Sequence, residues 1–132
     1  MATGLSAALA NDILDAVGNN SALTTIPITT FYIQLHTGDP GAAGTANIAG
    51  NATRKSVSFG SPSGGAMSND TGISWSTGEV DTSEDYTHWS GWDDPTAGNF
   101  MCSGTVTANA VTAGDQFDIA IGDLDLTLST AS

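Results

Sequence analysis

Most of this chain consists of short segments in which apolar and polar residues alternate, and turn residues separate almost all of them. In the first segment, which begins at Ile28, the side chains of Phe31, Ile33 and Leu35 fall on one face. A period of two is typical of a β-strand with one buried face. The pattern predicts seven strands, at about 28–35, 55–59, 72–76, 85–92, 99–111, 116–121 and 124–128. Short strands joined by polar turns favour an antiparallel β-sandwich or barrel.

One segment departs from this period. Leu5, Leu9, Ile13 and Val17 recur at a spacing of four, which predicts an N-terminal α-helix at about residues 4–17. The expected cap is Thr3 and the expected end is Gly18, and the opposite face carries Asn11, Asp12 and Asp15. The apolar stripe needs a partner surface, which is either its own domain or another subunit. We expect a single domain over residues 1–132, with 1–20 as its helical segment.

The charge of the chain narrows its possible partners. Two basic residues against 14 acidic ones give a net charge of −12, and only 12% of residues are charged. Nucleic-acid binding depends on cationic contacts to phosphate, so we expect no nucleic-acid partner. The charge is also unevenly distributed, with three acids and two bases in residues 1–69 and eleven acids and no base in 70–132. We predict that the near-neutral first half docks onto a neighbour and that the acidic second half faces solvent.

The single cysteine, Cys102, excludes an internal disulfide and lies in a strand-like run, where a buried apolar role is expected. The N-terminus lacks the pattern of a signal peptide, and no apolar run is long enough to span a membrane. We therefore expect synthesis in the cytoplasm and no membrane partner.

Two segments without periodicity, 37–53 and 60–71, are predicted to be long loops. Long loops in small domains are commonly functional. We predict that the 37–53 loop supplies the docking surface. The candidate docking residues are Gly38, Asp39, Pro40, Thr45, Asn47 and Arg54.

Side chains that could carry chemistry do not form a recognised pattern. His36 and His88 belong to no metal-ligand spacing, and the serines belong to no G-x-S-x-G elbow. Asp39-Pro40-Gly41 and Asp93-Asp94-Pro95 are better interpreted as turns, in which Asp accepts local backbone hydrogen bonds. We predict no catalytic residue, no metal ion and no cofactor.

Four aromatic residues form the best candidate ligand contact: Trp75, Tyr86, Trp89 and Trp92. Aromatic rings pack in cores, anchor subunit contacts and stack on sugars, and all three interpretations remain open. Strand alternation places Tyr86, His88 and Trp92 on one side of 85–92 and Trp89 on the other. Arg54 and Lys55 are the only cations of the chain, and Asp39 is a candidate carboxylate partner for Arg54.

The run from Leu35 to Thr45, together with Arg54, Phe59, the turn 93–100 and the ending 113–124, resembles small virion structural proteins of tailed bacteriophages. The resemblance implies a non-enzymatic structural protein of the virion. We expect a minor capsid or decoration protein on the capsid exterior, bound to the major capsid protein and to copies of itself as a homo-oligomer. The alternative is a tail-associated structural or host-glycan-binding protein.

Overall fold

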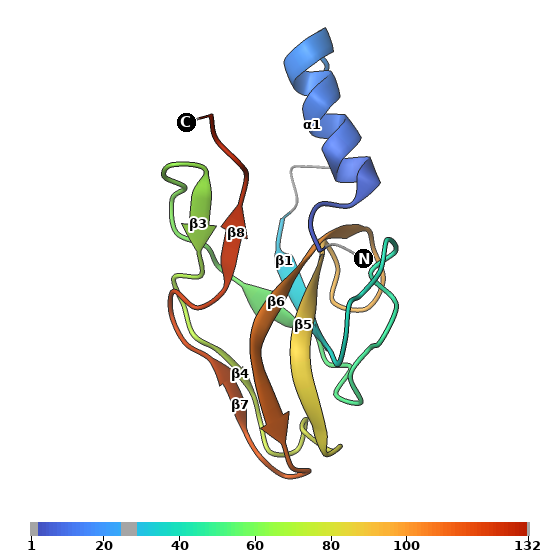
Figure 1. Ribbon diagram of the computed structural model, residues 1–132, viewed down its shortest axis with the longest axis vertical. Helices are drawn as coiled ribbons and strands as arrows, with labels where there is room; N and C mark the ends of the chain where they lie inside the picture. Colours follow the sequence, from blue (N-terminus) through green and yellow to red (C-terminus); the bar gives the residue numbers. More distant parts are fainter. Residues whose placement is uncertain (1–2, 25–28, 132) are drawn as a thin grey trace.

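A computed structural model describes residues 3–24 and 29–131 of the chain. The fold is mainly β with one helix near the N-terminus, and its sheets are antiparallel, as the alternating pattern predicts (Figure 1). The elements are α1 (Ala7–Asn19), β1 (Phe31–His36), β2 (Lys55–Val57), β3 (Ala66–Ser68), β4 (Ile73–Trp75), β5 (Glu84–Trp92), β6 (Phe100–Val111), β7 (Phe117–Ile119) and β8 (Asp125–Thr127).

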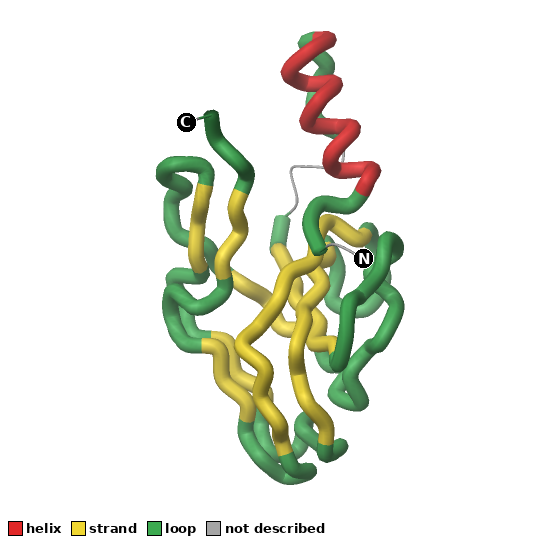
Figure 2. The backbone as a smooth tube through the Cα atoms, viewed as in Figure 1, coloured by secondary structure: helices red, strands yellow, loops and turns green. Residues whose placement is uncertain are grey.

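The largest sheet has four strands in the order β2-β1-β5-β6. β4 pairs with β7, and β3 pairs with β8, in two separate two-stranded ladders. Figure 2 shows the two ladders along one side of the large sheet, with long loops on the other. The core lies between the large sheet and the β4–β7 ladder, where Phe117 contacts Trp75 and Tyr86 at ring-centroid distances of 5.6 and 5.0 Å.

Strand β1 differs from the prediction of a half-buried strand, because both of its faces are covered. Gln34 and His36, on the face predicted to be open, are 5% and 0% exposed. The 37–53 loop folds back over this face: Ala49 donates its backbone N–H to the oxygen of Leu35 at 3.1 Å. A strand's own alternation cannot reveal that the loop after it will fold back over its polar face.

Helix α1 begins three residues later and ends two residues later than predicted. Ser6, rather than Thr3, is the N-cap, and its hydroxyl accepts a hydrogen bond from the backbone N–H of Leu9 at 3.2 Å. Asn20 closes the helix in the left-handed conformation, beyond the expected end at Gly18. The helix then projects away from the sheets (Figure 1).

Residues 4–6 attach the helix to the large sheet by extending its edge. The backbone N–H of Ser6 donates to the oxygen of Met101 at 2.7 Å, and that of Ser103 donates to the oxygen of Gly4 at 2.7 Å. β6 is the outer strand of its sheet, so this short pairing covers part of its free edge.

β5 begins at Glu84, one residue earlier than predicted, the other predicted strands form with shorter bounds, and one strand was missed. β3 lies inside the segment 60–71 that was predicted to be a loop, because three residues are too few to show a period. The predicted start of the first strand at Ile28 lies outside the described residues.

Candidate interaction surfaces

The 37–53 loop is held in place by its own polar groups. Asp39 Oδ1 accepts a hydrogen bond from the backbone N–H of Gly41 at 2.8 Å, which confirms the predicted turn. Asn47 donates from its side-chain amide to the oxygen of Asp39 at 2.9 Å, and its own oxygen accepts from the backbone N–H of Thr37 at 2.9 Å. Gly44 has a φ of 71°, and an added Cβ would lie 2.4 Å from the ring of Phe100. The loop therefore has a fixed conformation packed against the domain.

The structure places the six candidate docking residues at different depths. Thr45 and Asn47 are exposed at the tip of the loop. Gly38 and Asp39 are partly buried, as is Arg54, and Pro40 is completely buried. Of these six residues, Thr45 is therefore the most available to a partner, since Asn47 is also engaged in the loop's internal hydrogen bonds.

Arg54 connects the loop face to the turn after β5. Its guanidinium carbon lies 3.9 Å above the ring of Trp92, in a cation–π contact. Its Nη1 donates to the backbone oxygens of Asp94 at 2.8 Å and Ala97 at 2.7 Å. Burial lowers the pKa of Arg54, and the carboxylates of Asp94 and Asp93 oppose this change. Arg54 thus acts as an internal clamp on the turn.

That turn is shaped by its two carboxylates, as the sequence predicted. Asp94 Oδ1 accepts from the backbone N–H groups of Thr96 at 2.9 Å and Ala97 at 2.7 Å. Asp93 accepts from the backbone N–H of Asn99 at 2.6 Å and from its side-chain amide at 2.9 Å. The hydrogen bonds from the backbone N–H groups of Ala97 and Thr96 lower the pKa of Asp94.

His36 lies at the centre of a buried polar network beneath the loop. Its Nδ1 is 2.7 Å from the backbone oxygen of Ala46, which can only accept, so Nδ1 carries the proton. Its Nε2 then accepts from the hydroxyl of Ser90 at 2.7 Å, and Ser90 accepts from the indole N–H of Trp92 at 2.8 Å. Burial lowers the pKa of His36 below its ordinary value of 6.5, against the opposing effect of the Ala46 hydrogen bond. Both ring nitrogens of this neutral imidazole have structural partners.

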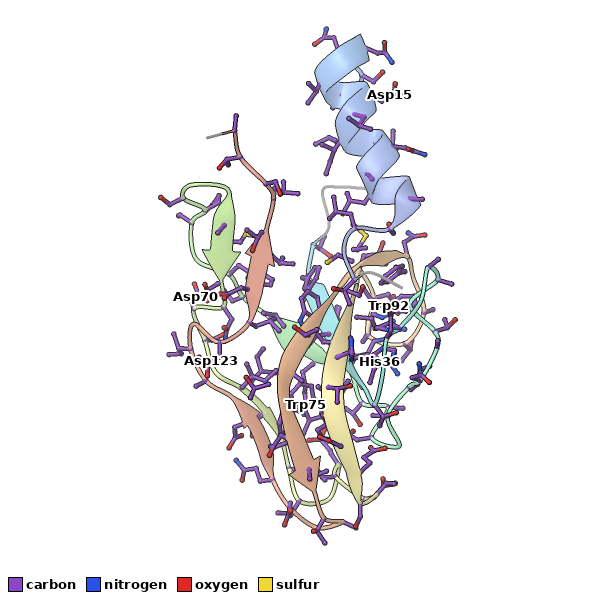
Figure 3. All side chains as sticks on the ribbon, viewed as in Figure 1. Asp15, His36, Asp70, Trp75, Trp92 and Asp123 are labelled. Carbon is purple, nitrogen blue, oxygen red and sulfur yellow. The ribbon has the colours of Figure 1, made fainter. Side chains whose placement is uncertain are left out.

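The four candidate aromatic contacts are interior. Trp75, Tyr86, Trp89 and Trp92 are between 0 and 6% exposed, and Figure 3 shows Trp75 inside the body of the domain. Of the three interpretations left open, burial favours core packing. The rings do not present a face on which a sugar could stack.

The predicted faces of β5 are corrected at Tyr86. Tyr86 joins Trp89 in the main core, whereas Trp92 lies with Ser90 beneath the loop. The pairing of β5 with β6 is irregular between Tyr86 and His88, and strict alternation fails across such an irregularity. No pattern in the sequence indicates this irregularity.

The acidic side chains of 70–132 are all exposed or partly buried in the single chain. Lys55 Nζ lies 2.6 Å from Glu79 Oε1, and this contact lowers the pKa of Glu79. Cys102 is buried as expected, and burial raises the pKa of its thiol to about 12.

Two buried or partly buried polar residues hold loops in place, and sequence reasoning missed both. Asn69 donates to the oxygens of Thr71 and Ala120 at 2.8 and 2.9 Å and accepts from Gly122 and Leu124 at 3.1 and 2.9 Å. Glu84 accepts from the backbone N–H groups of Gly50 at 2.9 Å and Asn51 at 3.3 Å. Both sets of contacts join segments far apart in sequence.

A second surface lies at the end of the molecule from which α1 projects. A groove of about 730 Å³ opens between α1, the large sheet and the β3–β8 ladder. Its walls include Leu9 and Ile13 from the helix, Phe31 and Phe59 from the sheet side, and Leu126 from β8. All the described residues that line it are uncharged.

Within residues 3–24 and 29–131, no three His, Cys, Asp or Glu side chains gather as metal ligands. In the same ranges, no helix is long and apolar enough to cross a bilayer.

The comparisons with known proteins identify the family. No curated protein matches the chain. A family model described as "Podophage GP4 fiber I protein gp80" matches residues 4–127, which is nearly the whole chain. The fibre description agrees with the tail-associated alternative better than with decoration of the capsid exterior. The chain therefore belongs to the podophage GP4 fiber I protein gp80 family, a family of phage virion structural proteins.

Proposed function

We propose that this protein is a non-enzymatic structural subunit of the podophage tail-fibre apparatus. The observation that carries the proposal is the family match, because it spans residues 4–127 and the family is described by a fibre protein. A location on the tail replaces the capsid exterior as the preferred site on the virion. The protein acts there by binding neighbouring virion proteins.

The contacts of the polar side chains support a binding role. The imidazole of His36 is held by Ala46 and Ser90. The carboxylates of Asp93 and Asp94 accept hydrogen bonds from the backbone of their own turn. These three side chains are thus engaged in holding loops, which is the use expected in a rigid building block.

The tip of the 37–53 loop is one proposed contact with a neighbouring virion protein. Thr45 is exposed there, and the conformation of the loop is fixed by Asn47 and by Glu84 from β5. A preorganised loop loses little conformational entropy when it binds. Virion proteins of the tail and copies of the chain are the proposed partners.

The number and position of copies on the virion test the assignment. We expect quantitative mass spectrometry of purified virions to find a small number of copies per particle, and separated tails to retain the protein. Immunogold labelling should mark the tail end of the particle. Hundreds of copies that remain with tail-less heads would overturn the assignment and restore the capsid interpretation.

A further inference from the structure

The outer edge of β6 is only partly covered. β6 is the longest strand and lies at the edge of the large sheet, with β5 on its inner side. Residues 4–6 pair with its outer side at residues 101–103, and no backbone hydrogen bond between described residues occupies that side at 105–110. The open segment contains no charged residue and no proline. A strand edge that lacks both is a template for pairing with another strand.

The register of β6 against β5 leaves part of this segment outside the ladder. Tyr86 is opposite Asn109 and His88 is opposite Thr105, so residues 106–108 of β6 have no partner residue on β5. A bulge of this kind leaves the extra residues of the longer strand unpaired. The backbone N–H and C=O groups of an unpaired segment need hydrogen-bond partners when water is excluded from them. The segment is therefore able to bond to the backbone of another chain.

A groove of about 400 Å³ lies beside the open edge. Its lining includes residues 106–109 of β6 together with Phe117 and Ile119 of β7. β7 pairs with β4 on its other side, and no described strand lies between β6 and β7 (Figure 1). Phe117 and Ile119 belong to the hydrophobic core, so the floor of the groove is apolar. Alternate side chains of an added strand would pack against such a floor.

The rim of this groove is acidic. Asp118, Asp123 and Asp125 line it, and the side chains of all three are exposed. Arg54 and Lys55, the only cations of the chain, make their contacts outside the groove. An acidic occupant, such as a second copy with its net charge of −12, would be repelled by this rim, whereas a cationic occupant would be attracted.

We propose that the open edge of β6 binds an extended, cationic segment of a neighbouring virion protein by strand addition. Backbone hydrogen bonds to residues 105–110 align the segment, and its lysine or arginine side chains lie against Asp118, Asp123 and Asp125. A cationic partner also offsets the cost of covering these carboxylates, because each gains an opposite charge. The inference rests on the proposed function for the partner being a virion protein, and it adds the chemistry of that partner.

A short synthetic peptide of alternating lysine and valine is the probe, and the control peptide has glutamate in place of lysine. We expect fluorescence anisotropy to show that the full chain binds only the lysine peptide, more weakly as salt rises. Asp118→Asn with Asp123→Asn should raise the dissociation constant about tenfold, because two exposed ion pairs are lost. Asp70→Asn with Asp81→Asn is the matched control: it makes the same change in net charge at exposed positions outside the groove, and should bind as wild type does.

Hydrogen exchange measured by mass spectrometry separates strand addition from attraction between charges alone. We expect the lysine peptide to slow amide exchange at residues 105–110, because their N–H groups gain partners, and to leave β3 unchanged. Binding without protection of 105–110 would overturn the proposal, as would equal binding of the two peptides or no binding of the lysine peptide. Protection that rises with the concentration of the chain alone would also overturn it, by identifying a second copy as the occupant.

The variants and the proposed function can be checked separately from this contact. Asp118 and Asp123 are exposed, so circular dichroism should show unchanged secondary structure in the double variant. The location of the protein on the tail is tested by its position on purified virions. Failure of the peptide to bind would therefore leave the tail assignment standing.

Discussion

The loop face and the helix end use their residues in opposite ways. On the loop face, Arg54, Trp92 and His36 have partners within the chain, and the described polar contacts there are internal. At the helix end, Leu14 and Val17 of α1 remain exposed beside an uncharged groove. The sequence directed attention to the loop, because polar and turn residues look functional. The structure shows that such residues also build the domain, whereas Leu14 and Val17 leave apolar surface exposed on α1.

The largest expected effect on stability comes from Trp92. Trp92→Ala removes the surface beneath Arg54 and the indole N–H that donates to Ser90. We expect the free energy of unfolding to fall by about 3–5 kcal/mol, as for other buried aromatic residues. Urea denaturation provides the measurement. The matched change at the helix end is Val17→Ala, which should alter the free energy of unfolding by less than about 0.5 kcal/mol. If Trp92→Ala and Val17→Ala lowered the free energy of unfolding by similar amounts, the contrast between the two regions would be wrong.

Arg54→Lys sharpens the contrast by keeping the charge and removing the planar guanidinium. Lysine cannot stack on Trp92 while donating to the oxygens of both Asp94 and Ala97. We expect a loss of about 1–2 kcal/mol, equivalent to one or two hydrogen bonds. Lys55→Ala is the control, since its contact with Glu79 is a partly exposed ion pair worth at most about 1 kcal/mol. A larger loss for Lys55→Ala would contradict the clamp assigned to Arg54.

Mild acid should act on the loop face through His36. Burial lowers its pKa in the folded chain below the ordinary value of 6.5, so the unfolded chain binds the proton more readily. Its contribution to stability is complete above about pH 6.5 and is lost as pH falls below that value, with a slope of at most about 1.4 kcal/mol per pH unit.

Denaturation of wild type and His36→Gln at several values between pH 5 and 7.5 measures this slope. We expect the slope to be smaller in His36→Gln, while His88→Gln should retain most of it, because burial of His36 is the largest cause of its lowered pKa and the charge of His88 is a smaller one. The carboxylates of Asp94 and Asp118, whose pKa values are lowered, should contribute their own loss at more acidic pH. Equal slopes in wild type and His36→Gln would show that the buried imidazole does not titrate in this window.

The smallest effect on stability is expected at the tip of the loop. Thr45→Arg should change the free energy of unfolding by less than about 0.5 kcal/mol, because Thr45 is exposed. If the tip contacts a neighbour, the same variant should reduce the copies retained on purified virions. Asp81→Ala is the control, because Asp81 is an exposed acid. The nearby Glu84 is not used, because it accepts hydrogen bonds from the backbone of Gly50 and Asn51 and so holds the loop in place. Full retention of Thr45→Arg would remove the loop tip from the proposed contacts and leave the edge of β6.

The sequence predicted the parts of the fold that depend on local pattern. Alternation located β1, β5 and β6, and a spacing of four located α1, since each element buries residues at its own period. Family membership could also be inferred, because the turns at Asp39 and Asp93 are sequence features.

The remaining features depend on contacts between distant segments. The burial of His36 depends on its hydrogen bonds to Ala46 and Ser90. The side chain of Asn69 is held by hydrogen bonds to Ala120 and Leu124. The periodicity of a short segment does not predict such tertiary contacts. The choice between a helix packed in its own domain and a helix packed on another subunit was open for the same reason, because exposure depends on how the helix leaves the sheet.

The strand order of the large sheet also has a consequence for biosynthesis. β1 lies in the middle of the sheet but pairs with β5, so that Tyr32 is opposite Trp92. The sheet therefore cannot close while the ribosome is still making the segment between them, and β1 must wait with its apolar face unprotected. Pairings this distant along the chain slow folding and expose unfinished chains to aggregation. A virion protein built in this way completes its fold only when most of the chain has emerged, which delays assembly until the chain is nearly finished.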